Sequence, residues 1–223
     1  MSYHRLFALS KKKVIITAGY KTLAGFGQDE FTEKKSRFIC CAKHIETETE
    51  AQAFISEICK KHWDARHNVY AYVLREGGVK RFSDDGEPQG TAGMPVLNVI
   101  EQNELTDCVL VVTRYFGGIL LGGGGLVRAY SHSAKLGIEN AGTVTVEPCL
   151  LLEVKTDYGS YAKIESLVRE CGGEIMNTDF ADSVLLEFKL MNTSLPDFEK
   201  KLADITNGAV AANIIGESEI FIK

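Results

Sequence analysis

The organisation of this chain depends on residues 108–130, which read CVLVVTRYFGGILLGGGGLVRAY. The run Cys108–Val112 is continuous, apolar and rich in β-branched side chains, which is typical of a buried strand, and we expect this strand to end at Arg114. After the glycines, apolar residues recur at helical spacing, so a helix should begin at or just after Gly125. Six glycines therefore occupy one strand-to-helix turn. The apolar residues of the expected helix are Leu126, Tyr130, Ala134 and Ile138.

The glycine-rich turn allows two interpretations. Glycine permits positive φ and lets another backbone or an anion come close, and the free N–H groups at a helix start favour negative charge. Arg114 and Arg128 flank the turn. It is either a cradle for a phosphate, a carboxylate or a nucleic-acid backbone, or a tight turn that needs small residues to pack a helix on a sheet. The candidate ligand-binding residues are Arg114, Tyr115, Gly117, Gly118, Gly122, Gly123, Gly124, Gly125 and Arg128.

Two known phosphate motifs do not fit this turn. A P-loop requires Lys and then Ser or Thr after its last glycine, whereas Gly125 is followed by Leu126 and Val127. The dinucleotide-binding fingerprint requires a third spaced glycine, which is absent after the quartet. Any anion site here must therefore be of another type.

The composition limits the class of protein. A length of 223 residues, with 45% hydrophobic and 25% charged residues, is ordinary for a globular protein of one large or two small domains. A net charge of −5 argues against coating nucleic acid by bulk electrostatics, so any nucleic-acid contact must be local. With no apolar run near the ~18 residues of a membrane span and no signal peptide, we expect a cytoplasmic protein without membrane association. The six cysteines lack Cys-x-x-Cys spacing, which favours reduced, buried thiols.

The first part of the chain shows a short series of patterned elements. Residues 1–28 have no clear period and are interpreted as a weakly ordered leader, with one candidate strand at Val14–Thr17. Thr47 and Glu50 form a capping box that opens a helix. Its apolar face comprises Ala51, Phe54, Ile55, Ile58 and Cys59. Strands are expected at residues 36–43, 69–74, 79–82 and 143–146, with a short helix from Pro95 to near Asn103.

Residues 83–95, SDDGEPQGTAGMP, form a second unusual stretch. Three carboxylates in four residues repel one another unless a cation, positive side chains or water offset the charge. Asp84, Asp85 and Glu87 could therefore bind magnesium beside the glycine turn, form a solvated turn, or pair with Arg114 or Arg128 and hold two loops together. His62 and His67 lack helical metal-site spacing and a third ligand, so we expect surface or hydrogen-bonding roles for them.

After Pro148 the pattern describes a second domain. We expect domains at residues 29–147 and 148–223. The second has the order βαββαβ of a ferredoxin-like fold. Its expected elements are strands 150–155, 174–178, 184–189 and 218–222 and helices 161–171 and 195–205.

Several segments together resemble the signature of the IMPACT/YigZ family in its bacterial two-domain form. They are RFSDDGEPQGTAG at 81–93, VTRYFGG at 112–118, GGLVRAY at 124–130, KKSRFI at 34–39 and ARHN at 65–68. The resemblance covers about residues 31–223. Arg66, His67, Ser83 and Thr91 lie in these segments and are candidate supporting residues.

The resemblance implies an α+β protein of two domains. The first would be similar to a small-subunit ribosomal protein domain and to the fourth domain of elongation factor G, and the ferredoxin-like second to the fifth domain of that factor. Eukaryotic members of the family are tied to translational control through competition for the activator of an initiation-factor kinase. The residues before Phe31 are too few for the extra RWD module of those proteins, which argues against that mechanism here.

Three functional hypotheses follow. The first is a non-enzymatic protein of the translation apparatus that holds RNA or the ribosome at the glycine turn, Arg114 and Arg128, with Tyr115, Phe116 and Tyr130 as candidate stacking faces. The second is an enzyme for a phosphorylated small molecule or nucleotide, with Asp84, Asp85 and Glu87 binding magnesium or acting as base. The third makes both loops a surface for a protein partner.

Overall fold

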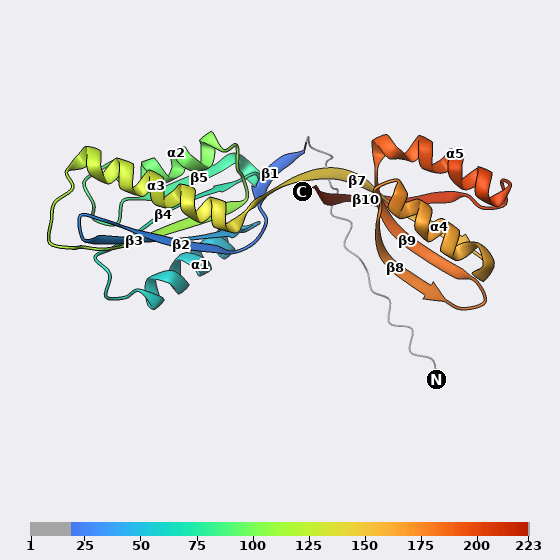
Figure 1. The fold of residues 1–223 in the computed structure, drawn as a ribbon, viewed down its shortest axis with the longest axis horizontal. Coiled ribbons are helices and arrows are strands. Elements are labelled where there is room, and N and C mark those ends of the chain that lie inside the picture. Colours follow the sequence, from blue (N-terminus) through green and yellow to red (C-terminus); the bar gives the residue numbers. More distant parts are fainter. Residues whose placement is uncertain (1–18, 223) are drawn as a thin grey trace. The chain divides into compact units, whose positions relative to one another are not determined.

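The computed structural model describes residues 19–222 and divides into two compact units (Figure 1). One contains residues 20–146 and the other residues 147–220. Each combines helices with an antiparallel sheet. The prediction of an α+β protein with two domains is confirmed. None of the helices between residues 19 and 222 is long and apolar enough to cross a membrane.

The first unit is built on a five-stranded sheet with the order β2-β3-β6-β4-β5, in which every pair is antiparallel. Strand β6 lies in the middle and is buried from Cys108 to Arg114, as its apolar sequence predicts. It ends at Tyr115 and directs Arg114 and the glycine turn to one edge of the sheet. The strands are β2 (Gly27–Glu33), β3 (Ser36–His44), β4 (His67–Leu74), β5 (Val79–Ser83) and β6 (Cys108–Tyr115).

Helices cover both faces of this sheet (Figure 1). Helix α1 (Glu48–Lys61) packs on one face, and α2 (Gly93–Gln102) and α3 (Gly123–Ala141) pack on the other. Because side chains alternate along a strand, β3 and β6 supply both cores. Ile39, Cys41, Val109 and Val111 face α1, whereas Cys40, Ala42, Leu110 and Val112 face α2 and α3.

The helix boundaries reflect capping. The predicted cap of α1 is present, because the Thr47 hydroxyl accepts a hydrogen bond from the Glu50 N–H at 3.2 Å. Helix α2 begins at Gly93 rather than at Pro95, since the Asp84 carboxylate binds the N–H groups of Ala92 and Gly93. Helix α3 begins at Gly123, two residues before the predicted start.

The interpretation of residues 1–28 as a weakly ordered leader does not hold for residues 20–28. They form β1 (Tyr20–Leu23) and the start of β2, which pair with Thr143–Val146 and with β3. These strands are short or polar, and β1 pairs with residues more than 100 positions later in the chain, so no local sequence pattern predicts them. The strand suggested at Val14–Thr17 lies outside the described residues.

The second unit has the predicted ferredoxin-like order. Its strands lie in the order β10-β7-β9-β8, and alternate residues of β7 and β9 form a core with α4 and α5. Residues 143–146 and 150–155, expected as separate strands, belong to one strand. Pro148 is tolerated within it because it lies between the stretch that pairs with β1 and the stretch that pairs with β9, where neither pairing needs a hydrogen bond from its backbone nitrogen. The elements are β7 (Thr143–Thr156), α4 (Tyr158–Glu170), β8 (Glu174–Phe180), β9 (Val184–Met191), α5 (Leu195–Thr206) and β10 (Ala212–Ile222), and the short 3₁₀ helices are η1 (Glu76–Gly78) and η2 (Asn192–Ser194).

Candidate functional site

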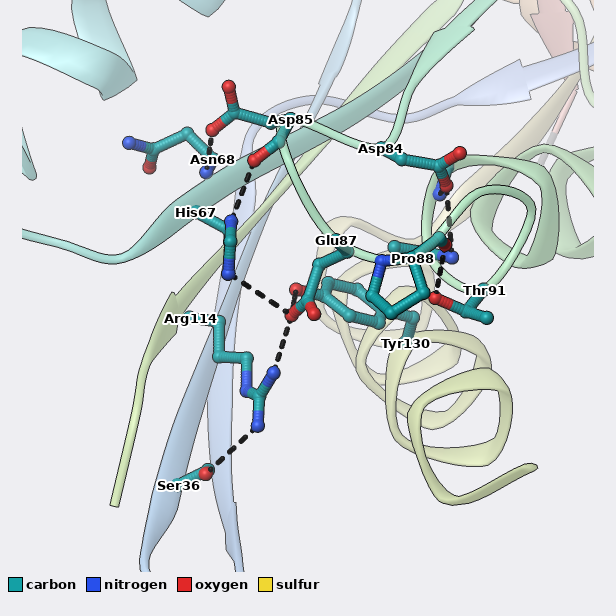
Figure 2. Close-up of polar contacts among 12 residues, drawn as sticks. Ser36, His67, Asn68, Asp84, Asp85, Glu87, Pro88, Thr91, Arg114 and Tyr130 are labelled. Carbon is teal, nitrogen blue, oxygen red and sulfur yellow. Dashed lines mark hydrogen bonds and ion pairs between the residues drawn. The ribbon is translucent and has the colours of Figure 1, made fainter. Parts of the chain in front are cut away.

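A buried ion pair lies where β6, α3 and the loop between β5 and α2 (residues 84–92, the carboxylate loop) meet (Figure 2). The Arg114 Nη1 group donates to Glu87 Oε1 at 2.6 Å, and the two side chains are only 5% and 3% exposed. The Tyr130 hydroxyl, from α3, donates to the same oxygen at 2.8 Å. Burial, and then the Glu87 charge, raises the pKa of Tyr130, so its hydroxyl remains a donor. Glu87 therefore joins three segments that are distant in sequence.

His67, the first residue of β4, completes this cluster. Its Nδ1 atom points to the main-chain oxygen of Asp85 (Figure 2), and the two atoms are 2.6 Å apart. A carbonyl oxygen only accepts hydrogen bonds, so Nδ1 must carry the proton of that bond. Nε2 then faces Glu87 Oε1 at 3.8 Å. The loop thus fixes both the orientation and the tautomer of His67.

The carboxylates of Asp84 and Asp85 are bound to main-chain N–H groups. Asp84 accepts hydrogen bonds from Gly90 at 2.8 Å and from Ala92 and Gly93 at 3.1 and 2.8 Å, and Asp85 accepts one from Asn68 at 2.6 Å. Within residues 19–222 no group of three or more His, Cys, Asp or Glu side chains is arranged to hold a metal ion. Of the three carboxylates, Glu87 makes the pairing with an arginine that the sequence suggested, whereas Asp84 and Asp85 bind main-chain N–H groups.

Two of the other candidate supporting residues, Ser83 and Thr91, make contacts with the carboxylate loop, and Arg66 precedes β4. The Ser83 hydroxyl accepts from the Asp85 N–H at 3.1 Å, and the Thr91 hydroxyl donates to the main-chain oxygen of Pro88 at 2.6 Å. Arg66 is bound through its main-chain N–H to the oxygen of Arg114, which leaves its exposed side chain beside the ion pair.

Half of the six glycines are explained by the local fold. A Cβ on Gly117 would lie 2.0 Å from the carbonyl carbon of Lys35, so only glycine lets the turn pack there. Gly118 and Gly122 have φ of 83° and 74°, in the region that favours glycine. Gly122 then serves as the residue before α3 without any side-chain cap.

The other glycines belong to the first turn of α3. A Cβ on Gly125 would approach Leu121 Cβ at 3.0 Å. A Cβ on Gly123 or Gly124 would meet nothing closer than 3.8 or 3.7 Å, and neither has a positive φ. Since the first intrahelical bond runs from the Leu126 N–H to Gly122, the N–H groups of these three glycines have no partner within the helix.

Two pockets lie on either side of this helix start, and Leu121 lines both. Pocket A is a cavity of about 430 Å³ and pocket B one of about 280 Å³. Pocket A is lined by the polar residues Arg66, His67, Glu87 and Arg114, the apolar residues Pro88, Phe116, Leu120, Leu121 and Leu126, and Gly122 and Gly123. Pocket B is lined by Phe31, Glu33, Lys34, Leu121, Gly125, Arg128, Ala129 and His132.

The structure therefore separates residues that the sequence grouped together. Arg114 lines pocket A and Arg128 lines pocket B. Tyr115 points to the opposite face of the sheet, where its hydroxyl donates to Asp64 at 3.1 Å and lies 3.0 Å from His62 Nδ1.

Some contributors were not among the predicted site residues. The helical spacing of Tyr130 predicts a core position, which is confirmed, but nothing in the sequence indicates that its hydroxyl reaches Glu87. Ser36, whose hydroxyl accepts from Arg114 at 3.4 Å and from the Gly117 N–H at 3.2 Å, lies in a motif segment without any signal of this contact. Leu120 is 82% exposed beside pocket A, and only its place in the glycine turn could have drawn attention to it.

Comparison with known proteins gives consistent matches. Residues 34–138 match the family described as the Impact N-terminal domain, and residues 154–209 match a domain family of unknown function, DUF1949. IMPACT family member YvyE of Bacillus subtilis is 40% identical over 85% of this chain and 88% of its own length. IMPACT family member YigZ of Escherichia coli is 37% identical over 82% and 92%.

A solved structure and a eukaryotic relative extend these matches. A crystal structure described only as a hypothetical protein is 34% identical and aligns with a TM-score of 0.57 over 89% of this chain and 98% of its own. The Protein IMPACT homolog of Dictyostelium discoideum is 39% identical over 45% of this chain and 29% of its own length. Because the bacterial relatives align along most of both chains at 37–40% identity, this protein belongs to the IMPACT family.

Proposed function

We propose that this chain is a non-enzymatic RNA-binding protein of the translation apparatus, in which the start of α3 holds a phosphate of the RNA backbone. The observation that carries the proposal is the pair Gly123 and Gly124. Neither crowding nor positive φ requires glycine at these two positions. Glycine in a helix costs about 0.5–1 kcal/mol relative to alanine, so its presence needs another reason.

Close approach of an anion supplies that reason. The N–H groups of the first helical turn point out of the helix end, and the helix dipole adds a positive potential there. Without Cβ atoms, Gly123 and Gly124 let phosphate oxygens reach these N–H groups. The N–H groups have neither intrahelical partners nor a side-chain cap, which suits a ligand in their place.

Exposed cations surround this helix start. Arg66 lines pocket A, and Lys34 and Arg128 line pocket B on the other side. A phosphate backbone that crosses the helix start would pass within the range of these cations. Such a local cluster is compatible with an overall charge of −5, because salt screens the charges that lie far from the phosphate and leaves the nearby cations to determine the interaction.

The setting in translation rests on family membership. The family resemblance connects eukaryotic members to translational control, and this chain has relatives named IMPACT in Dictyostelium and in vertebrates. The bacterial relatives share most of this chain, including the part that contains the glycine turn. RNA of the translation apparatus is therefore the partner we test.

The test is cosedimentation with ribosomes and subunits, together with equilibrium binding of a single-stranded RNA, at several salt concentrations. The variant is Lys34→Ala/Arg128→Ala, and its charge-matched control is Lys60→Ala/Lys135→Ala, exposed positions of the same unit outside both pockets. If wild type makes four phosphate contacts, its affinity for single-stranded RNA should fall ~50-fold between 50 and 200 mM salt. The variant, with two contacts left, should lose only ~7-fold. Wild-type binding that is absent, or that does not respond to salt, would refute the proposal.

A further inference from the structure

We propose that pocket A binds one phosphorylated nucleoside, with its phosphate at the start of α3 and its base against Phe116. The nucleotide is either free or the terminal residue of an RNA strand. This inference rests on the proposed phosphate site and adds a specificity to it. It concerns Arg66, the Glu87–Arg114 pair, Phe116 and the first turn of α3, which together form pocket A.

The size and lining of pocket A fit a single nucleotide. Its volume of about 430 Å³ lies toward the lower end of the range of small-molecule sites, which is roughly 300–1,000 Å³. Apolar side chains form much of its wall and a few side chains, those of Arg66, His67, Glu87 and Arg114, supply polar groups, which is the usual composition of such a site. A folded RNA element would not enter a cavity of this size, whereas one unstacked nucleotide would.

The charges of pocket A favour an anion at the end formed by α3. Glu87 and Arg114 neutralise one another, and Tyr130 adds a further hydrogen bond to the Glu87 carboxylate. The exposed Arg66 side chain and the positive end of the α3 dipole remain as uncompensated charge. The phosphate of a nucleotide is therefore expected between Arg66 and the N–H group of Gly123, which lines pocket A.

A second, independent observation points to a ligand. Arg114 Nε is buried and has no hydrogen-bond partner among the described residues, although Nη1 and Nη2 of the same guanidinium are bound to Glu87 and Ser36. Buried N–H groups without a partner are rare in folded proteins. Since Arg114 lines pocket A, an oxygen of a bound base or ribose would supply the missing acceptor.

Phe116 provides the stacking surface. Its ring is 46% exposed, it lines pocket A, and the Arg114 guanidinium lies 5.4 Å from its centroid. This contact holds the ring in place while part of it stays open. Bases stack on such rings with little preference for sequence, so several nucleotides should bind.

The binding test is calorimetric titration of the full chain with AMP and CMP, with adenosine and inorganic phosphate as the two halves of the ligand. We expect the nucleotides to bind more tightly than either half. Phe116→Ala should weaken nucleotide binding by about ten-fold or more. Phe180→Ala, which removes an exposed ring of the second unit, should leave it unchanged. A thermal melt of each variant verifies that it is folded.

The source of the nucleotide is distinguished with RNA. Linear oligonucleotides phosphorylated at the 5′ or the 3′ end are compared with a circular oligonucleotide of the same sequence. Tighter binding of a linear form, displaced by AMP in wild type but poorly in Phe116→Ala, identifies an RNA end as the occupant. Equal binding of linear and circular RNA, together with AMP binding that depends on Phe116, identifies a free nucleotide.

The two proposals can fail separately. Absence of AMP and CMP binding at millimolar concentration, together with unchanged RNA binding by Phe116→Ala, would overturn the nucleotide pocket and leave RNA binding at α3 intact. Nucleotide binding that depends on Phe116 in a protein that binds no RNA would overturn the proposed function and leave the pocket.

Discussion

Replacing the two unexplained glycines of α3 should stabilise the protein and weaken its binding of RNA. In Gly123→Ala/Gly124→Ala the new methyl groups meet no atom closer than 3.7 Å, and neither backbone position has a positive φ. Each substitution should gain up to about 1 kcal/mol from the higher helix propensity of alanine, and the pair up to about 2 kcal/mol. The same methyl groups would stand between a phosphate and the N–H groups of the helix start, so affinity for single-stranded RNA should fall.

Urea unfolding and RNA titration of the same preparations measure both effects. Gly122→Ala is the matched control, because Gly122 has φ 74° and ψ 163°, a conformation that costs other residues about 1–3 kcal/mol. It should therefore lower stability, in contrast to its neighbours. If Gly123→Ala/Gly124→Ala is less stable than wild type, the fold itself requires these glycines. If it is more stable and binds RNA as well as wild type, no anion approaches the helix start.

Three further predictions concern the buried polar groups. Glu87→Gln should destabilise the protein by about 3–5 kcal/mol in urea unfolding, because it leaves the Arg114 guanidinium buried without its counter-charge. A loss of stability below about 1 kcal/mol would show that water already solvates the pair. Tyr130→Phe removes a hydrogen bond to that carboxylate and should cost about 1.5–3 kcal/mol in the same assay, whereas unchanged stability would place the hydroxyl outside the cluster. Burial lowers the pKa of His62 below its usual 6.5, so the unfolded chain gains a proton first as pH falls, and the stability of the wild type should decline below about pH 6.5. His62→Gln should lack this decline. Parallel profiles of stability against pH for the two proteins would contradict the assignment.

The elements of the fold were predictable where a single periodic pattern decided them. The apolar run that became β6, the capped face of α1 and the βαββαβ order of the second unit depend on residues close together in sequence. The strands β1 and β2 were missed because their pairing partners, rather than their own composition, make them strands. The start of α2 depends on Asp84, which lies eight residues before its partner Ala92 in a loop without regular structure.

The site was predictable as a set of residues but not as a geometry. The sequence identified Glu87, Arg114 and the glycine turn, and it left open whether the carboxylates bind a metal or pair with an arginine. Strand order produces the pairing of Glu87 with Arg114, because β6 lies between β3 and β4 and so brings Arg114 to the loop that follows β5. Strand order does not follow from local patterns. For the same reason, sequence alone could not show that Arg114 and Arg128 line different pockets.

The burial of Arg114 determines which arginine can test anion binding. Two of its three donor groups are already bound within the protein, and Glu87 depends on it for counter-charge. Removing Arg114 would leave that carboxylate buried and unpaired, so a loss of binding in Arg114→Ala would reflect a damaged fold as much as a lost contact. Arg66 is exposed, lines the same pocket and is not part of the pair. Arg66→Ala should therefore keep wild-type stability while weakening RNA and nucleotide binding, and this combination of results is what a phosphate held between Arg66 and α3 requires.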